Sequence, residues 1–204
     1  MNQSYPNAAG GLKLMFWGQI LSIVGALVTG LGAGLAVADA MTGGSGGIGV
    51  MAILGLLVVI AASVLNILGL YKAGDDDAAY RSALMFAIAA LVVSVLSTFL
   101  SGIPFLPTLL SLVSTVLNFL VVKTVCETTG NLLHSVGNDA LADRGATVAK
   151  IYFICTVISV VCTVLSIIPI INILSGLVSA VSGIVSLVGY IMYLTFLNGG
   201  SNSL

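Results

Sequence analysis

The sequence predicts an all-α membrane protein with six transmembrane helices, arranged as three tandem helical hairpins. Hydrophobic residues make up 59% of the 204 residues and charged residues 6%, whereas a soluble domain carries about 25% charged residues. The apolar residues also occur in long uninterrupted runs, as a segment must to cross the roughly 30 Å hydrocarbon core of a bilayer. The few charged side chains cannot cover a soluble globule of this size, which excludes a cytosolic enzyme.

The first hairpin is expected to follow a short N-terminal tail, residues 1–13. Its two spans are predicted at residues 14–38 and 48–71, on either side of a glycine-rich turn. The start of the chain also resembles a signal peptide, because Ala38-Asp39-Ala40 offers small residues for cleavage. The apolar stretch is longer than the roughly 7–15 residues of such a signal, so we favour an uncleaved first span.

Proline marks the turn of each of the other two hairpins. Residues 83–122 carry no charge, and one helix of this length would be about 60 Å long. Pro104 and Pro107 divide this run, because proline lacks an amide donor and restricts the residue before it. Pro169 divides the later run in the same way. We therefore predict spans at 83–102, 106–126, 148–168 and 171–197, within one domain of residues 14–197, and a tail at 198–204.

The basic residues predict the orientation of the chain in a cell membrane. With six spans, all six basic residues lie in or beside the termini and the loops on one side: Lys13, Lys72, Arg81, Lys123, Arg144 and Lys150. Short loops rich in lysine and arginine normally remain cytoplasmic. The N- and C-termini are therefore expected in the cytoplasm.

Two segments on this basic side are similar to each other. Residues 74–83 align with residues 137–146 at a constant offset of 63, which indicates tandem hairpins of the same orientation. The segment 69–76, followed by 80–84, resembles uncharacterised multi-span membrane proteins of gut-type anaerobic bacteria. The resemblance covers the first two hairpins and implies no particular activity.

The interior of the spans holds small and polar residues but no charged ones. The middle of each predicted span lacks Asp, Glu, Lys, Arg and His, residues that mark proton relays and ion sites in membranes. Small faces bring helices together in lipid, and hydroxyl or amide groups bond between helices. Two interpretations follow, helix packing or the lining of a lumen, for one set of residues: Gln19, Gly30, Gly34, Asn66, Asn118, Ser175, Ser179, Ser182 and Ser186.

The longest predicted loop, 127–147, is the expected surface for a partner in the cytoplasm. Its charged residues are Glu127, His134, Asp139, Asp143 and Arg144. The alternative is that these charges solvate the loop and fix its orientation. Besides membrane lipid, the partners to consider are a second copy of the chain or another membrane protein. The net charge of −1 gives no basic face for nucleic acid.

No catalytic, cofactor or metal site is predicted, and we do not expect an enzyme. Cys126, Cys155 and Cys162 form no CxxC pair and lack histidine or carboxylate residues at ligand spacing. The tyrosines and Trp17 fall mostly near span ends, where we interpret them as an interfacial aromatic belt.

Two functions remain open from the sequence. We favour a structural or accessory membrane subunit, and the alternative is a small transporter or channel with a hydroxyl-lined path. A close-packed centre would favour the first function, and a wide path lined by the polar residues would favour the second.

Overall fold

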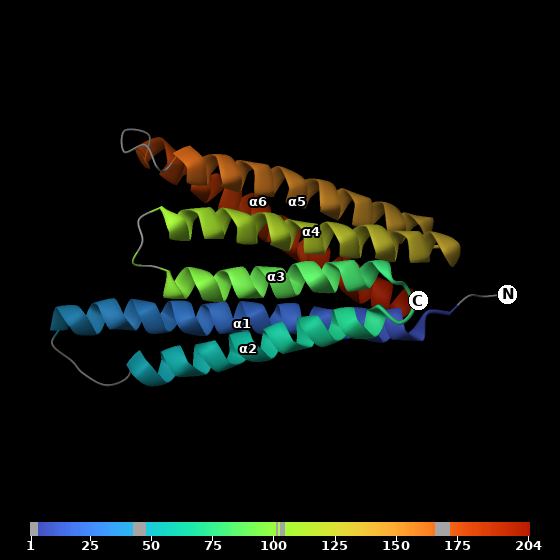
Figure 1. Ribbon diagram of the computed structural model, residues 1–204, viewed down its shortest axis with the longest axis horizontal. Coiled ribbons are helices and arrows are strands. Elements are labelled where there is room, and N and C mark those ends of the chain that lie inside the picture. Colours follow the sequence, from blue (N-terminus) through green and yellow to red (C-terminus); the bar gives the residue numbers. More distant parts are fainter. Residues whose placement is uncertain (1–3, 43–47, 101, 103–104, 166–171) are drawn as a thin grey trace.

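The computed structural model describes residues 4–42, 48–100, 102, 105–165 and 172–204. Over these residues the fold is all-α, with six long helices and no strand (Figure 1). The helices are α1 (Pro6–Thr42), α2 (Ile48–Ala73), α3 (Ala79–Phe99), α4 (Leu106–Ser135), α5 (Asp139–Leu165) and α6 (Asn172–Ser203). In a bilayer the backbone must satisfy its own hydrogen bonds, and a helix does so within one segment.

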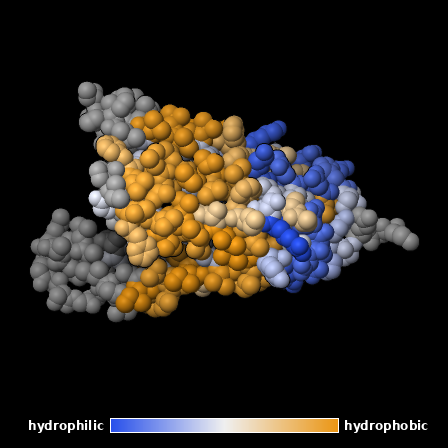
Figure 2. All heavy atoms as spheres, in the orientation of Figure 1, coloured by the Kyte–Doolittle hydropathy of each residue, from blue (hydrophilic) through white to orange (hydrophobic). Residues whose placement is uncertain are grey.

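Five of the helices, α1 to α5, are long and apolar enough over their described residues to cross a bilayer. Large apolar side chains are exposed along them, for example Leu31, Met85 and Phe99. Figure 2 shows these side chains as a broad apolar band, with the hydrophilic residues gathered at one end of the bundle. The chain is therefore an all-α membrane protein with a broad band of exposed apolar side chains along its helices.

The hydrophilic end, which we call the polar end, also holds the start of α1 and the C-terminus (Figure 1). The Tyr5 amide donates to the Leu204 carbonyl oxygen at 3.1 Å. Asp76, in the turn between α2 and α3, accepts hydrogen bonds from the Asn7 side chain at 2.9 Å and the Ala8 amide at 2.7 Å. The Ala8 backbone amide lies in the first turn of α1. The backbone N–H groups of a first turn lack helical partners and favour a nearby negative charge. The polar end is thus tied together by segments far apart in sequence.

The predicted loop 127–147 is wrong as a loop, because α4 continues to Ser135 and α5 begins at Asp139. The extension buries Thr128, Thr129 and Leu133 in the core at the polar end. Helix α4 is capped at Val136 and followed by a glycine with a left-handed backbone, Gly137 at φ +81°. The Gly137 amide donates to the His134 carbonyl oxygen and the next amide to that of Leu133, which satisfies the last carbonyls of the helix. The first helix also begins earlier than predicted, at Pro6.

The helices form a ring in chain order, and α6 returns to pack against α1. The contact between α1 and α2 is the most extensive. Small residues seven positions apart bring these two backbones together: Gly11, Gly18 and Gly25 on α1, and Gly55, Ala62 and Gly69 on α2. A Cβ atom on Gly69 would lie 2.6 Å from the Gly11 carbonyl oxygen, and one on Gly18 would lie 3.0 Å from that of Ala62. We call this contact the glycine seam.

Candidate functional site: a cavity between the helices

A cavity of about 690 Å³ lies inside the ring, and each of the six helices contributes residues to its wall. Its volume falls within the roughly 300–1,000 Å³ that is usual for sites that bind small molecules. Among the described residues that line it there is no Asp, Glu, Lys, Arg or His. The wall therefore combines apolar side chains with neutral hydroxyl and amide groups.

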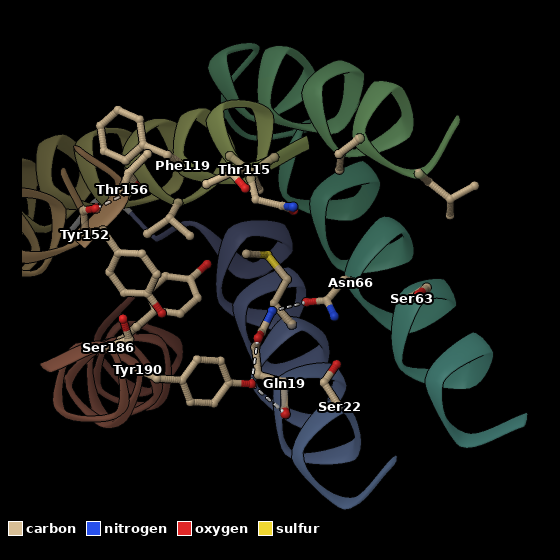
Figure 3. Close-up of a pocket in the computed structure, with 18 of the residues that line it drawn as sticks. Gln19, Ser22, Ser63, Asn66, Thr115, Phe119, Tyr152, Thr156, Ser186 and Tyr190 are labelled. Atoms are coloured by element: carbon tan, nitrogen blue, oxygen red, sulfur yellow. Dashed lines mark hydrogen bonds between the residues drawn. The ribbon is translucent and has the colours of Figure 1, made fainter. Parts of the chain in front are cut away.

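One wall of the cavity is a chain of hydrogen bonds that links α6, α1 and α2 (Figure 3). The Tyr190 hydroxyl donates to the side-chain and backbone oxygens of Gln19, both at 2.8 Å. The Gln19 Nε2 atom donates to Asn66 Oδ1 at 2.9 Å. Asn66 Nδ2 in turn donates to the Ala62 carbonyl oxygen at 2.9 Å. Gln19 thus joins three helices at one point of the wall.

The facing wall carries a second, sparser polar group between α3 and α4. The Ser94 hydroxyl donates to the Ala90 carbonyl oxygen, so Ser114 is left to donate in the 3.3 Å hydrogen bond between the two serines. Asn118 Nδ2 donates to the Ser114 carbonyl oxygen at 2.9 Å. Asn66 and Asn118 therefore make the same bond, each to the carbonyl four residues earlier, and both line the cavity.

Several hydroxyl groups on the wall are bonded to their own helices. The donors are Ser63 to Val59, Ser94 to Ala90, Thr115 to Ser111 and Thr156 to Tyr152, each to a carbonyl oxygen at 2.8–2.9 Å. Such bonds use the only hydrogen of the hydroxyl group. These residues present an oxygen lone pair, or a methyl group, to the cavity instead of a donor. The wall is thus less polar than its composition indicates.

Tyrosines supply the free donors at the polar end of the cavity. The rings of Tyr152 and Tyr193 meet edge to face with centroids 5.8 Å apart, and both line the cavity. Tyr193 is only 2% exposed, and its hydroxyl group bonds to none of the described residues. No fully buried side-chain oxygen among these residues lacks a partner. The Tyr193 hydroxyl therefore keeps its accessible surface within the cavity.

A packed core closes the cavity at the polar end. Its largest fully buried side chains include Tyr80, Phe196, Leu12 and Leu133. The Tyr80 and Thr129 hydroxyls share a buried hydrogen bond of 2.7 Å between α3 and α4. Because these residues come from four helices, a molecule in the cavity cannot leave through the polar end unless helices move apart.

The structure brings together some of the polar residues that the sequence indicated and separates others. Gln19, Asn66, Asn118 and Ser186 line the cavity. Gly30 takes no part in the helix contact, because a Cβ atom built there has no described atom within 4 Å. The residues Gly34, Ser175, Ser179 and Ser182 belong to α1 and α6, but their surroundings lie outside the described part of the chain.

The residues predicted for a partner loop lie on helices at the polar end. Glu127, His134, Asp139, Asp143 and Arg144 are all exposed there. Glu127 lies 3.7 Å from Lys123, one turn earlier on α4. His134 Nδ1 lies 2.6 Å from Asp139 Oδ1, across the turn between α4 and α5. Both contacts are solvated, so the charges form an exposed rim and no enclosed site.

Two features of the site were missed by sequence reasoning. The aromatic-belt interpretation is wrong for Tyr152, Tyr190 and Tyr193, which line the cavity, and for Tyr80, which is fully buried. Trp17 is half exposed, and its place in an interfacial belt stays a prediction. The glycine seam was also missed, although the seven-residue spacing of its small residues is readable in the sequence.

The described residues hold no group of three or more metal-ligating side chains. Cys126, Cys155 and Cys162 are free thiols, of which Cys155 is buried and lines the cavity. No protein-family model, curated protein or solved structure matches the chain. Functional inference therefore rests on the cavity itself.

Proposed function

We propose that the chain is a membrane carrier that binds a small uncharged molecule in the central cavity. The observation that supports this proposal is a cavity of about 690 Å³ whose described lining is neutral and comes from all six helices. A structural or accessory subunit, the function that the sequence favours, would use a close-packed centre. The cavity is the reason for preferring the carrier.

The closed polar end favours a carrier over an open channel. Tyr80, Leu133 and Phe196 fill the space between the cavity and the polar end. Transport through this core requires the helices to separate, as in the gated closure of other carriers. We further propose that the polar end faces the cytoplasm of a cell, because all the basic residues lie at or near it in the sequence.

Two native cysteines test the proposal without added residues. Cys155 lines the cavity, and Cys126 is 1% exposed in the core at the polar end. In variants that keep one cysteine each, with the others changed to alanine, we expect methyl methanethiosulfonate to modify Cys155 at least tenfold faster than a cationic methanethiosulfonate does. Cys126 should react slowly with an impermeant maleimide applied on the polar side, because the reagent reaches this thiol only while the core is open.

Cys162, on the same helix as Cys155 and outside the cavity wall, is the matched control. Thr156→Phe, which fills part of the cavity, should abolish the preference of Cys155 for the neutral reagent. The same substitution should leave the reaction rates of Cys162 with both reagents unchanged. Inert Cys155 and Cys126 in a folded protein would contradict a carrier and favour the accessory role.

The proposed orientation has its own test. Gly44→Cys and Ser201→Cys, in a background without the native cysteines, should react with impermeant maleimide from opposite sides of the membrane, with residue 201 on the cytoplasmic side. Labelling of both from the same side would contradict six spans.

A further inference from the structure

The ring of helices has one weak contact, between α2 and α3. The pairs α1/α2, α3/α4, α4/α5, α5/α6 and α1/α6 all pack more extensively. Helices α2 and α3 follow each other in sequence through the short turn at residues 74–78, and they diverge from this turn in Figure 1. Of the neighbouring helix pairs around the ring, α2 and α3 are therefore the least closely packed.

The cavity reaches this contact from both helices. Val59 on α2 and Leu91 on α3 line the cavity, yet they are 39% and 42% exposed. Their neighbours on the outer surface are large and apolar, including Ile60 and Val92, which are about half exposed. This outer surface belongs to the apolar band, so an opening between α2 and α3 would lead to lipid and not to water.

The chemistry of the wall changes with distance from this opening. Beside α2 and α3 the wall holds the apolar residues Val59, Ile67 and Leu91. The polar residues there already have partners, since Ser63 and Ser94 donate to their own helices and Asn66 bonds to Gln19 and to the Ala62 carbonyl oxygen. The free hydroxyls of Tyr152 and Tyr193 lie on α5 and α6. A charged group would lose its water without gaining a counter-ion among the described lining residues, at a large cost in free energy. The wall suits a molecule with an apolar chain at one end and a neutral hydrogen-bonding group at the other.

We infer that the space between α2 and α3 is a lateral portal, through which a single-chain amphiphile with an uncharged hydroxyl or amide headgroup passes from the bilayer into the cavity. Its headgroup bonds to the tyrosine hydroxyls and its chain lies along Val59 and Leu91. The inference rests on the proposed function, to which it adds the class of substrate and its route.

A photoreactive fatty alcohol tests both parts in proteoliposomes of phosphatidylcholine that contain the full chain. The probe is a diazirine-bearing dodecanol, and the readout is the amount of label on peptides of α5 and α6 that line the cavity. We expect labelling that excess dodecanol suppresses, and at least tenfold less labelling by the matching carboxylate. Tyr193→Phe should weaken labelling by the alcohol several-fold, because the headgroup loses a partner. Equal labelling by both probes would overturn the neutral class.

The portal is tested by Leu91→Trp, which adds bulk at the opening. Cavity labelling should fall at least fivefold. The matched control is Met85→Trp on the same helix, at a side chain 71% exposed and outside the cavity wall; it should label like the unmodified protein. Val59→Trp blocks the same opening from α2, in case Leu91→Trp does not fold. Undiminished labelling in a folded portal variant would overturn the lateral route.

Failure of this inference is separable from failure of the proposed function. If Cys155 reacts with methyl methanethiosulfonate but the alcohol does not label the cavity, the cavity remains a binding site and the amphiphile is the wrong class. If neither reagent reaches the cavity, the proposed function fails as well.

Discussion

The hairpins α1/α2 and α3/α4 use small residues in different ways. In α1/α2 the glycine seam brings two backbones into contact, with Gly69 against Gly11 and Gly18 against Ala62. In α3/α4 the small residues are serines, and Ser94 and Ser114 meet through their side chains at 3.3 Å beside the cavity. Close backbones gain dispersion contacts along their whole length, whereas a hydroxyl pair holds two helices at one level and leaves space beside it. Both hairpins line the cavity, but the first is closely packed along its backbones and the second is joined by side chains.

The largest expected effect breaks the glycine seam. Gly69→Leu places a side chain against the Gly11 carbonyl oxygen and the Met15 side chain, where a Cβ atom alone would lie 2.6 Å from each. Overpacking typically costs about 1–3 kcal/mol, and we expect about 3 kcal/mol here because the obstacle is backbone. The measurement is the free energy of unfolding in detergent. Gly30→Leu is the control, because a Cβ atom at Gly30 has no described atom within 4 Å, and it should cost less than about 0.5 kcal/mol.

The second effect lies in α3/α4, at the polar end. Tyr80→Phe removes the 2.7 Å hydrogen bond to Thr129 and leaves the Thr129 hydroxyl buried without that partner. We expect a loss of about 1–2 kcal/mol in the free energy of unfolding. Thr129→Val in the same chain should add little, because the bond is already lost. An additive loss in the double variant would show that the two residues act independently.

A smaller effect is expected where the glycine seam borders the cavity. Gln19→Leu removes the bonds that Gln19 makes to Asn66 and Tyr190. Hydrogen bonds between membrane helices average about 0.6 kcal/mol each, so we expect a loss of about 1 kcal/mol by chemical unfolding. Ser63→Ala removes a bond within one helix and serves as the control. A loss in Ser63→Ala as large as that in Gln19→Leu would contradict the role of Gln19 in joining helices.

The smallest effect tests the hydroxyl contact of α3/α4. Ser114→Ala removes two long and exposed hydrogen bonds, one with the Ser94 hydroxyl at 3.3 Å and one from Asn118 Nδ2 at 3.4 Å, and we expect a loss of about 0.5 kcal/mol or less. The cavity and its reaction with methyl methanethiosulfonate at Cys155 should be unchanged. A loss comparable to that of Gly69→Leu would mean that the serines pack the helices as the glycines do.

The sequence by itself determined the class of fold and the places where the helices break. Charge depletion and long apolar runs require membrane spans, and proline or glycine turns divide them, because these properties are local to each segment. The helix ends at the polar end were predicted less accurately than the breaks between helices, as the predicted loop 127–147 shows. Helices α4 and α5 continue past the apolar run because Thr129 and Leu133 find a core to pack against, and that core comes from other helices.

Only the tertiary structure decided which polar residues share a site. Gln19, Asn66 and Asn118 stood out in the sequence because polar amides are rare in apolar spans, and all three line the cavity. Tyr193 did not stand out, since tyrosines near span ends are usual in interfaces. Whether a side chain faces lipid, a neighbouring helix or a cavity depends on the rotation of its helix within the ring. That rotation is set by contacts such as the glycine seam, which join residues about 25 to 60 positions apart. The seven-residue spacing of small residues within one span does not say which helix these residues face.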